Sequence, residues 1–160
     1  MTVVVADTSP LNYLVLIGHI DVLHRLYGRV LVPSEVLAEL TDARAPQQVR
    51  EWIQPLPEWV EVRDARGDSN DPALEQIDPG ERAAILLAQD EPDVLLLIDD
   101  AAGREEANRR AIPNTGTLGI LRAAGKRELL DLRSALTRLA ATNFRASHAL
   151  IEQLLAEDSR

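Results

Sequence analysis

Hydrophobic positions along the chain predict five short strands. Two runs, Val3–Ala6 and residues 94–98, are apolar at every position, which is the pattern of strands that are covered on both faces. Three shorter stretches end in β-branched residues and predict further strands at residues 29–32, 59–62 and 112–115. None of these runs is long enough to favour a helix instead.

Between the strands, apolar residues recur at helical spacing. The start of the first helix carries clear signals, because Thr8 and Ser9 are good N-caps and Pro10 is tolerated in a first turn. Asp78 and Pro79 mark another helix start in the same way. One predicted helix follows Asp7 directly, and the others cover residues 19–26, 33–40, 47–53, 78–88, 101–110, 127–139 and 146–156, with one more from a turn at 116–119 to near residue 125.

Strands that alternate with helices from end to end predict the α/β fold class. We expect a three-layer sandwich, in which a mainly parallel central sheet is flanked by helices. The length of 160 residues suits a single domain spanning residues 1–160. Residues 63–78 are rich in Gly, Asp, Asn, Ser and Pro and are predicted to form a loop.

Composition narrows the chemistry. The chain has no cysteine and only three scattered histidines, which excludes a thiolate site or a cysteine nucleophile and disfavours zinc. Aromatic residues make up 3% of the chain, which argues against an aromatic platform for stacking bases. The N-terminus lacks the features of a signal peptide and no apolar run is long enough to span a membrane, so we expect a cytoplasmic protein with no membrane partner.

The charge is unevenly distributed. The formal net charge of -9 argues against a nucleic-acid partner when the chain is taken as a whole. Residues 1–100, however, carry a net charge of -12, whereas residues 101–160 carry +3. Part of the acidity can therefore belong to a concentrated metal site, with basic surface supplied by the C-terminal third.

Carboxylates stand where the two clearest strands end. Asp7 follows the first strand, and Asp99 and Asp100 follow the strand at residues 94–98. The carboxyl ends of parallel strands meet at one edge of a sheet, so these acids can come together. Glu39, on a helix, and Glu81, in a first helical turn, can point to the same edge.

Such a cluster requires cations, because carboxylates in one cleft repel each other. Oxygen ligands without Cys or His favour Mg²⁺ or Mn²⁺, and this is the chemistry of a metal-dependent nuclease. Simpler roles stay open: Asp7 as a helix cap, Glu81 as a carboxylate that compensates the helix dipole, and Glu35 with Glu39 as a solvated helix edge.

Five segments together resemble a PIN domain, and in particular the prokaryotic subgroup with a Gly-Glu helix and an Ile-Asp-Asp strand end. They run in the expected order over nearly the whole chain, at residues 5–11, 32–40, 79–88, 97–100 and 116–119. The resemblance implies a PIN-like fold and cleavage of RNA that depends on Mg²⁺ or Mn²⁺. It also implies the toxin of a toxin–antitoxin pair, acting as a homodimer and silenced by a small antitoxin protein.

The resemblance assigns roles residue by residue. Its four catalytic acids fall on Asp7, Glu39, Glu81 and Asp99, with Glu35 as the alternative to Glu39 and Asp100 as the alternative to Asp99. Glu81 stands where the wider family commonly has aspartate, which bears on the strength of catalysis. The implied metal ligands are Asp7, Glu81, Asp99 and Asp100, and the supporting side chains are Thr8, Ser9 and Glu35.

Basic residues after the second acidic strand are the expected phosphate contacts, although an ordinary solvated helix face explains any one of them equally well. They are Arg104, Arg109, Arg110, Arg122, Lys126 and Arg127.

Two other functions compete with the ribonuclease. One is a PIN-like protein that binds RNA or regulates a partner with weak or no catalysis. The other is a phosphatase with an aspartyl nucleophile, which is disfavoured because Ser9 stands where a second acid is needed.

Overall fold

The protein is described by a computed structural model that covers residues 1–67 and 71–158. Its centre is a five-stranded sheet in the order β3-β2-β1-β4-β5, with every neighbouring pair parallel. The strands are β1 Val3–Ala6, β2 Val30–Val32, β3 Val60–Val62, β4 Val94–Leu97 and β5 Asn114–Thr115. The predicted α/β class and parallel sheet are confirmed.

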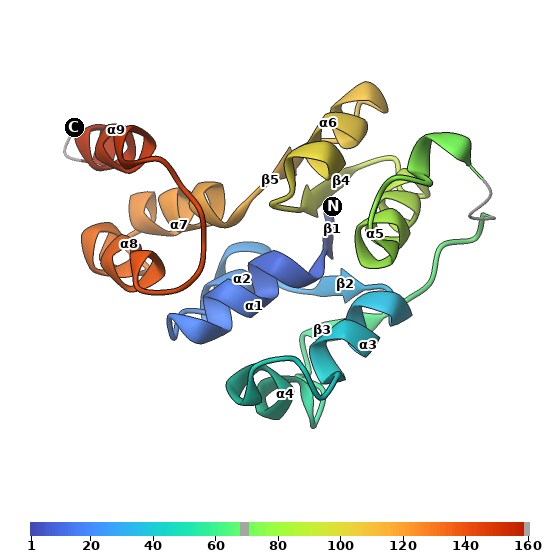
Figure 1. The fold of residues 1–160 in the computed structure, drawn as a ribbon, viewed down its shortest axis with the longest axis horizontal. Helices are drawn as coiled ribbons and strands as arrows, with labels where there is room; N and C mark the ends of the chain where they lie inside the picture. Colours follow the sequence, from blue (N-terminus) through green and yellow to red (C-terminus); the bar gives the residue numbers. More distant parts are fainter. Residues whose placement is uncertain (68–70, 159–160) are drawn as a thin grey trace.

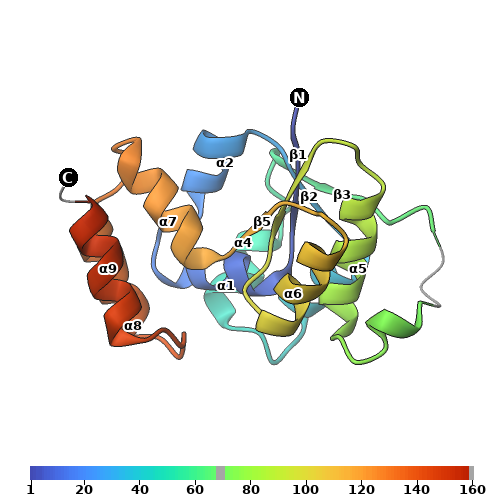
Figure 2. The same cartoon turned by 90° about the horizontal axis from the view of Figure 1, so that it is seen from above.

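Nine α-helices lie among the described residues and cover both faces of the sheet (Figure 1). They are α1 Thr8–Leu16, α2 Asp21–Tyr27, α3 Ser34–Thr41, α4 Gln47–Ile53, α5 Pro79–Gln89, α6 Ala101–Arg109, α7 Thr117–Lys126, α8 Leu132–Ala140 and α9 His148–Asp158. Figure 2 shows α8 and α9 beyond α7, away from the sheet.

The side chains of β1 contribute to two separate clusters of the core, because successive side chains of a strand point to opposite faces of the sheet. Val4 and Ala6 pack with α1, α2, α3, α4 and α7, while Val5 packs with α5 and α6. All three side chains are buried. The continuous apolar run in the sequence is thus the signature of a central strand in a three-layer sandwich.

One predicted helix begins later than expected. The prediction of a helix at 127–139 is wrong for its first five residues, because α8 starts at Leu132. Glu128 instead takes a positive φ of 57°, and the Leu129 amide donates to the carbonyl of Ala124 at 2.9 Å. This is a left-handed C-terminal cap of α7, formed without the glycine that usually announces one.

The predicted loop at 63–78 contains a short ordered element, and residues 68–70 of it lie outside the described residues. A 3₁₀ turn, η1 Pro72–Leu74, is capped by Asp71, whose carboxylate accepts from the Ala73 amide at 3.0 Å. Leu74 is buried against α5, and the Arg82 guanidinium donates to its carbonyl at 3.0 Å. The part of the segment next to α5 is therefore anchored.

No helix in the described part of the chain is both long and apolar enough to pass through a membrane.

The two faces of β4 predict different costs for two neighbouring truncations. Leu96 is fully buried against α5, whereas Leu95 is only half-buried. Leu96→Ala should lower the free energy of unfolding by about 2–5 kcal/mol, and Leu95→Ala by clearly less. Urea denaturation measures both, and an equal loss in the two variants would contradict the assignment of the faces.

Candidate active site

The sheet brings the predicted acids to one edge. Asp7 follows β1, and Asp99 follows β4, the neighbour to which β1 is paired along its full length. The Asp7 amide donates to the Leu97 carbonyl at 2.9 Å, which joins the two strand ends. Helices α3 and α5, which carry Glu39 and Glu81, pack against each other at the same edge.

Asp7 is the most deeply buried of these acids, with 3% of its surface exposed. Its side chain makes no capping hydrogen bond to α1, so the role of helix cap is not the one seen here. Among the described residues its Oδ1 atom is buried without any hydrogen-bond partner. Burial, followed by the negative charges of Glu39, Asp78 and Asp99, raises the pKa of Asp7 to about 7, although the Thr8 amide opposes this.

Asp99 is held in a fixed orientation. Its Oδ2 accepts from Ser9 Oγ at 2.9 Å and from Thr117 Oγ1 at 2.7 Å, and its Oδ1 accepts from the Thr117 amide at 2.6 Å. This amide belongs to the first turn of α7, where the helix dipole favours an anion. A Cβ on Gly116 would lie only 2.6 Å from Oδ1, so the close approach requires glycine.

Glu39 is fixed by contacts from two other helices. Thr8 Oγ1 donates a hydrogen bond to its Oε2, and a Cβ on Gly80 would lie 2.5 Å from its Oε1. The carboxylate therefore lies directly over the start of α5. Burial, and then the negative charge of Asp78, raises the pKa of Glu39, although the Thr8 hydroxyl opposes the shift.

Glu81 and Asp100 complete the group with Asp78. Burial, followed by the charges of Asp7 and Asp100, raises the pKa of Glu81 to about 8. Asp100 caps α6 by accepting from the Gly103 amide at 3.1 Å, and Asp78 caps α5 by accepting from the Gly80 amide at 2.9 Å. We call the six residues the carboxylate cluster: Asp7, Glu39, Asp78, Glu81, Asp99 and Asp100.

The donor set of this cluster fits a hard cation. All its side-chain donors are oxygens, and Asp7 Oδ1 is a buried acceptor with nothing to accept from. Within the described ranges no group of three His, Cys, Asp or Glu side chains is arranged so that it could hold a metal ion as it stands. A cation held by Asp7, Asp99, Glu81 and Asp100 would therefore require these side chains to move.

A comparison of the chain with models of known protein families identifies its family. A family model described as a PIN domain matches residues 3–160. The chain belongs to the PIN domain family. Its members are in general nucleases, which are hydrolases. No curated protein matches this PIN domain.

Some expected residues of the PIN domain lie away from the cluster. Glu35, the alternative to Glu39, is exposed one turn earlier on α3 and accepts from Ser34 Oγ at 2.9 Å. It lines a separate depression together with Asp64. The structure therefore brings Glu39, and not Glu35, to the carboxylate cluster.

The expected phosphate contacts on α6 differ in position. Arg104 lies at the cluster, because a Cβ on Gly116 would be 3.7 Å from its Nη1, and its Nε donates to Asn114 Oδ1 at 3.2 Å. Arg109 and Arg110 lie at the other end of α6. Arg110 is only 15% exposed and pairs with Asp71 at 2.6 Å and with Glu106 at 3.0 Å.

The expected contacts on α7 are farther away. Arg122 pairs with Glu157 of α9 at 3.1 Å. Lys126 and Arg127 lie at the C-terminal end of α7, about 15 Å along the helix from Thr117. Arg127 donates to the carbonyl of Arg25 at 3.4 Å, so these three side chains do not surround the cluster.

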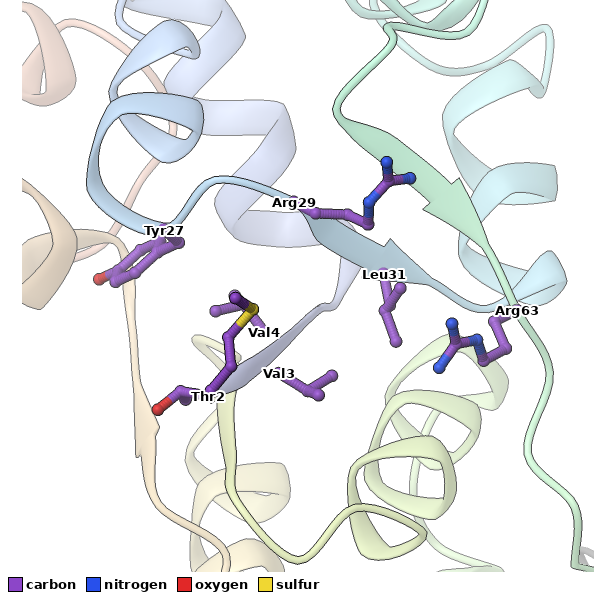
Figure 3. A pocket seen from close by; sticks show the side chains of 8 residues that line it. Thr2, Val3, Val4, Tyr27, Arg29, Leu31 and Arg63 are labelled. Carbon is purple, nitrogen blue, oxygen red and sulfur yellow. The ribbon is translucent and has the colours of Figure 1, made fainter.

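A pocket of about 190 Å³ lies at the opposite, amino-terminal edge of the sheet (Figure 3). Tyr27, Leu31, Arg29 and Arg63 line it. The two guanidinium groups share one carboxylate, that of Glu61. No member of the carboxylate cluster lines this pocket, so it is not the candidate active site.

Sequence reasoning gave no site role to Asp78, Thr117 and Gly80. Asp78 was visible only as a helix cap, and its proximity to Glu39 depends on how α3 packs on α5. Thr117 lies within one of the family-like segments, and a hydroxyl directly after the last strand was the available signal for it. Gly80 was visible within the Gly-Glu helix start, but its contact with Glu39 was not.

Gly80→Ala should displace Glu39, because the added Cβ would overlap its carboxylate. The carboxylate is the end of a flexible side chain, so the melting temperature should change little while nuclease activity falls roughly tenfold or more. Gly67→Ala is the matched control, because nothing lies within 4 Å of a Cβ there. Full activity of Gly80→Ala would show that the position of Glu39 is not required.

The raised pKa values also predict a response of the metal-free protein to pH. An acid with a higher pKa in the folded than in the unfolded chain stabilises the fold less as pH rises between the two values. For Asp7 and Glu81 the interval runs from 3.8 and 4.5 to about 7 and about 8. In EDTA the protein should therefore melt at a lower temperature at about pH 8 than at about pH 5.

Scanning calorimetry measures this difference, and a matched pair of variants assigns it. Asp7→Asn removes one of the two groups and should reduce the loss. Asp93→Asn, whose side chain accepts from Thr2 at the opposite edge of the sheet, should keep it. A melting temperature that stays constant or rises over this interval would contradict the electrostatics described here.

Proposed function

We propose that this PIN domain is an endoribonuclease that depends on Mg²⁺ or Mn²⁺ and cuts RNA phosphodiester bonds at the carboxylate cluster. The observation that carries the proposal is the unpaired Oδ1 of Asp7, buried beside the other acidic side chains of the carboxylate cluster. A buried carboxylate oxygen without a donor requires either a proton or a cation. Membership of a nuclease family supports the cation and an RNA partner.

The residues of the cluster have two different roles in this proposal, which are binding the cation and accepting a proton. Asp7, Asp99, Glu81 and Asp100 would hold the cation, with Asp99 kept in orientation by Ser9 and Thr117. When bound, a divalent cation supplies charge stabilisation to the phosphodiester and makes a water more acidic. Glu39, whose pKa is raised, suits the acceptance of a proton from the attacking water at Oε1, while Thr8 holds Oε2.

Cleavage of a labelled structured RNA tests the proposal. Wild-type protein should cut in Mg²⁺ or Mn²⁺ and stop in EDTA, and Asp7→Asn should reduce cutting to background while it keeps the fold. Asp93→Asn makes the same chemical change at the opposite edge and should cut like the wild type. Metal-dependent cutting that persists in Asp7→Asn would overturn the assignment of the site.

The proposal extends to a biological role. The family-like segments support the toxin of a toxin–antitoxin pair, a cytoplasmic protein that acts as a homodimer and is silenced by a small antitoxin. Induced expression in a bacterial host should arrest growth, and Asp7→Asn should relieve the arrest. Normal growth at a high level of folded wild-type protein would contradict the toxin role.

A second function is favoured by one observation. Glu81 is longer than the aspartate that the wider family commonly has at this position. This difference suits a PIN-like protein that binds RNA or regulates a partner with weak or no cutting. Binding of RNA without cleavage in either metal would favour this second function.

A further inference from the structure

A depression of about 260 Å³ lies beside the carboxylate cluster and shares Glu39 with it. Thr8 and Asn12 of α1 line one side, and Glu39 of α3 lines another. The remaining wall is the connection from α3 to α4, through Asp42, Arg44 and residues 45–46. The depression is therefore a continuation of the site and not a separate cavity.

Arg44 is the one basic residue among those that line this depression. Its side chain is 92% exposed. The Nε atom donates to Asp42 Oδ1 at 3.0 Å and the Nη2 atom to Oδ2 at 3.2 Å. Its Nη1 donates to no group in the described part of the chain, so part of the guanidinium remains available to a ligand.

The connection that carries Arg44 is well ordered by hydrogen bonds. The Arg44 amide donates to Asp42 Oδ1 at 2.8 Å, and the Ala45 amide donates to the Asp42 carbonyl at 2.9 Å. Arg50, on α4, donates to the Ala45 carbonyl at 3.1 Å. Arg44 is thus presented on a braced turn, which lowers the entropic cost of using it to bind.

We propose that Arg44 binds a phosphate of the RNA strand one nucleotide away from the bond that is cut, with the depression receiving that nucleotide's sugar. The inference rests on the proposed ribonuclease function. An exposed ion pair such as Arg44–Asp42 contributes little, so a phosphate can replace Asp42 at low cost. The guanidinium fork matches two phosphate oxygens at once.

The size and place of the depression define the substrate. Its volume of about 260 Å³ lies just below the roughly 300–1,000 Å³ of small-molecule sites, so it suits one sugar–phosphate unit of a single strand and not a duplex. Glu39 belongs both to its wall and to the cluster, and Thr8, which also lines the wall, donates a hydrogen bond to Glu39. A strand that lies in the depression therefore reaches the cluster at an adjacent phosphate.

Binding of a fluorescent single-stranded RNA oligonucleotide tests this inference apart from catalysis. Anisotropy is measured in Mg²⁺ on the Asp7→Asn background, which prevents cutting, over a series of salt concentrations. Arg44→Gln should weaken binding roughly tenfold and lower the salt slope by about one phosphate contact. Arg44→Lys should keep the slope and lose part of the affinity, because it keeps the charge and loses the fork.

Arg29→Gln is the matched control. Arg29 is 61% exposed, pairs with Glu61 at 3.3 Å and lies at the opposite edge of the sheet (Figure 3). The Arg29→Gln variant, made on the same Asp7→Asn background, should bind RNA as tightly as the background protein does. Unchanged affinity in Arg44→Gln, at an unchanged melting temperature, overturns the inference, and so does an equal loss in Arg29→Gln, which would indicate a nonspecific effect of charge.

The two proposals fail in different ways. If wild-type protein cuts RNA while Arg44→Gln binds normally, the ribonuclease stands and the role of Arg44 falls. If wild-type protein does not cut but Arg44→Gln loses affinity, Arg44 does bind RNA and the ribonuclease proposal is wrong.

Discussion

The burial of one carboxylate governs the arrangement of this molecule. Asp7 directly follows the central strand and is only 3% exposed, so its charge has little solvent to stabilise it. An unpaired carboxylate in such a place destabilises the fold unless it is protonated or bound to a cation. The raised pKa of Asp7 reflects the first state. The oxygens around it provide for the second.

The residues around Asp7 hold the neighbouring acidic side chains in place. Hydroxyl groups of α1 reach in two directions, from Thr8 to Glu39 and from Ser9 to Asp99. Three helices, α5, α6 and α7, begin at the same edge and present amides to Asp78, Asp100 and Asp99 respectively. Helix starts attract negative charge, which helps to explain how these acids are tolerated in one place although none of them forms an ion pair with a basic residue in the described part of the chain.

The strands and the acids that follow them could be predicted because a strand buried on both faces has a continuous run of apolar residues in the sequence. The apolar runs that end at Asp7 and Asp99 have no other simple interpretation, and parallel strands bring their ends to one edge. The pairing of Thr8 with Glu39 could not be predicted, because it depends on how α1 rotates against α3. The same holds for Asp78, whose neighbours come from helix packing and not from its own segment.

Basic residues were the least predictable part of the site. Nothing in the sequence indicates a partner for Arg110, yet it forms ion pairs with Glu106 and with Asp71, which lies 39 positions away. Arg44 reads like an ordinary loop residue, yet the turn carries it to the rim of the depression beside Glu39. The left-handed Glu128 likewise gives no sign in a sequence of good helix formers. Only Arg110 is decided by a long-range partner, because local hydrogen bonds close the turn at Arg44 and the cap at Glu128.

Calorimetric titration of Mn²⁺ into the folded wild-type protein at about pH 7 tests the central claim most directly. A cation that replaces protons on Asp7 and Glu81 should bind with release of on the order of one proton per protein, seen as a heat that changes with the ionisation enthalpy of the buffer. The Asp7→Asn variant should release fewer protons and bind more weakly. Absence of binding in correctly folded wild-type protein, or binding without proton release, would contradict the account.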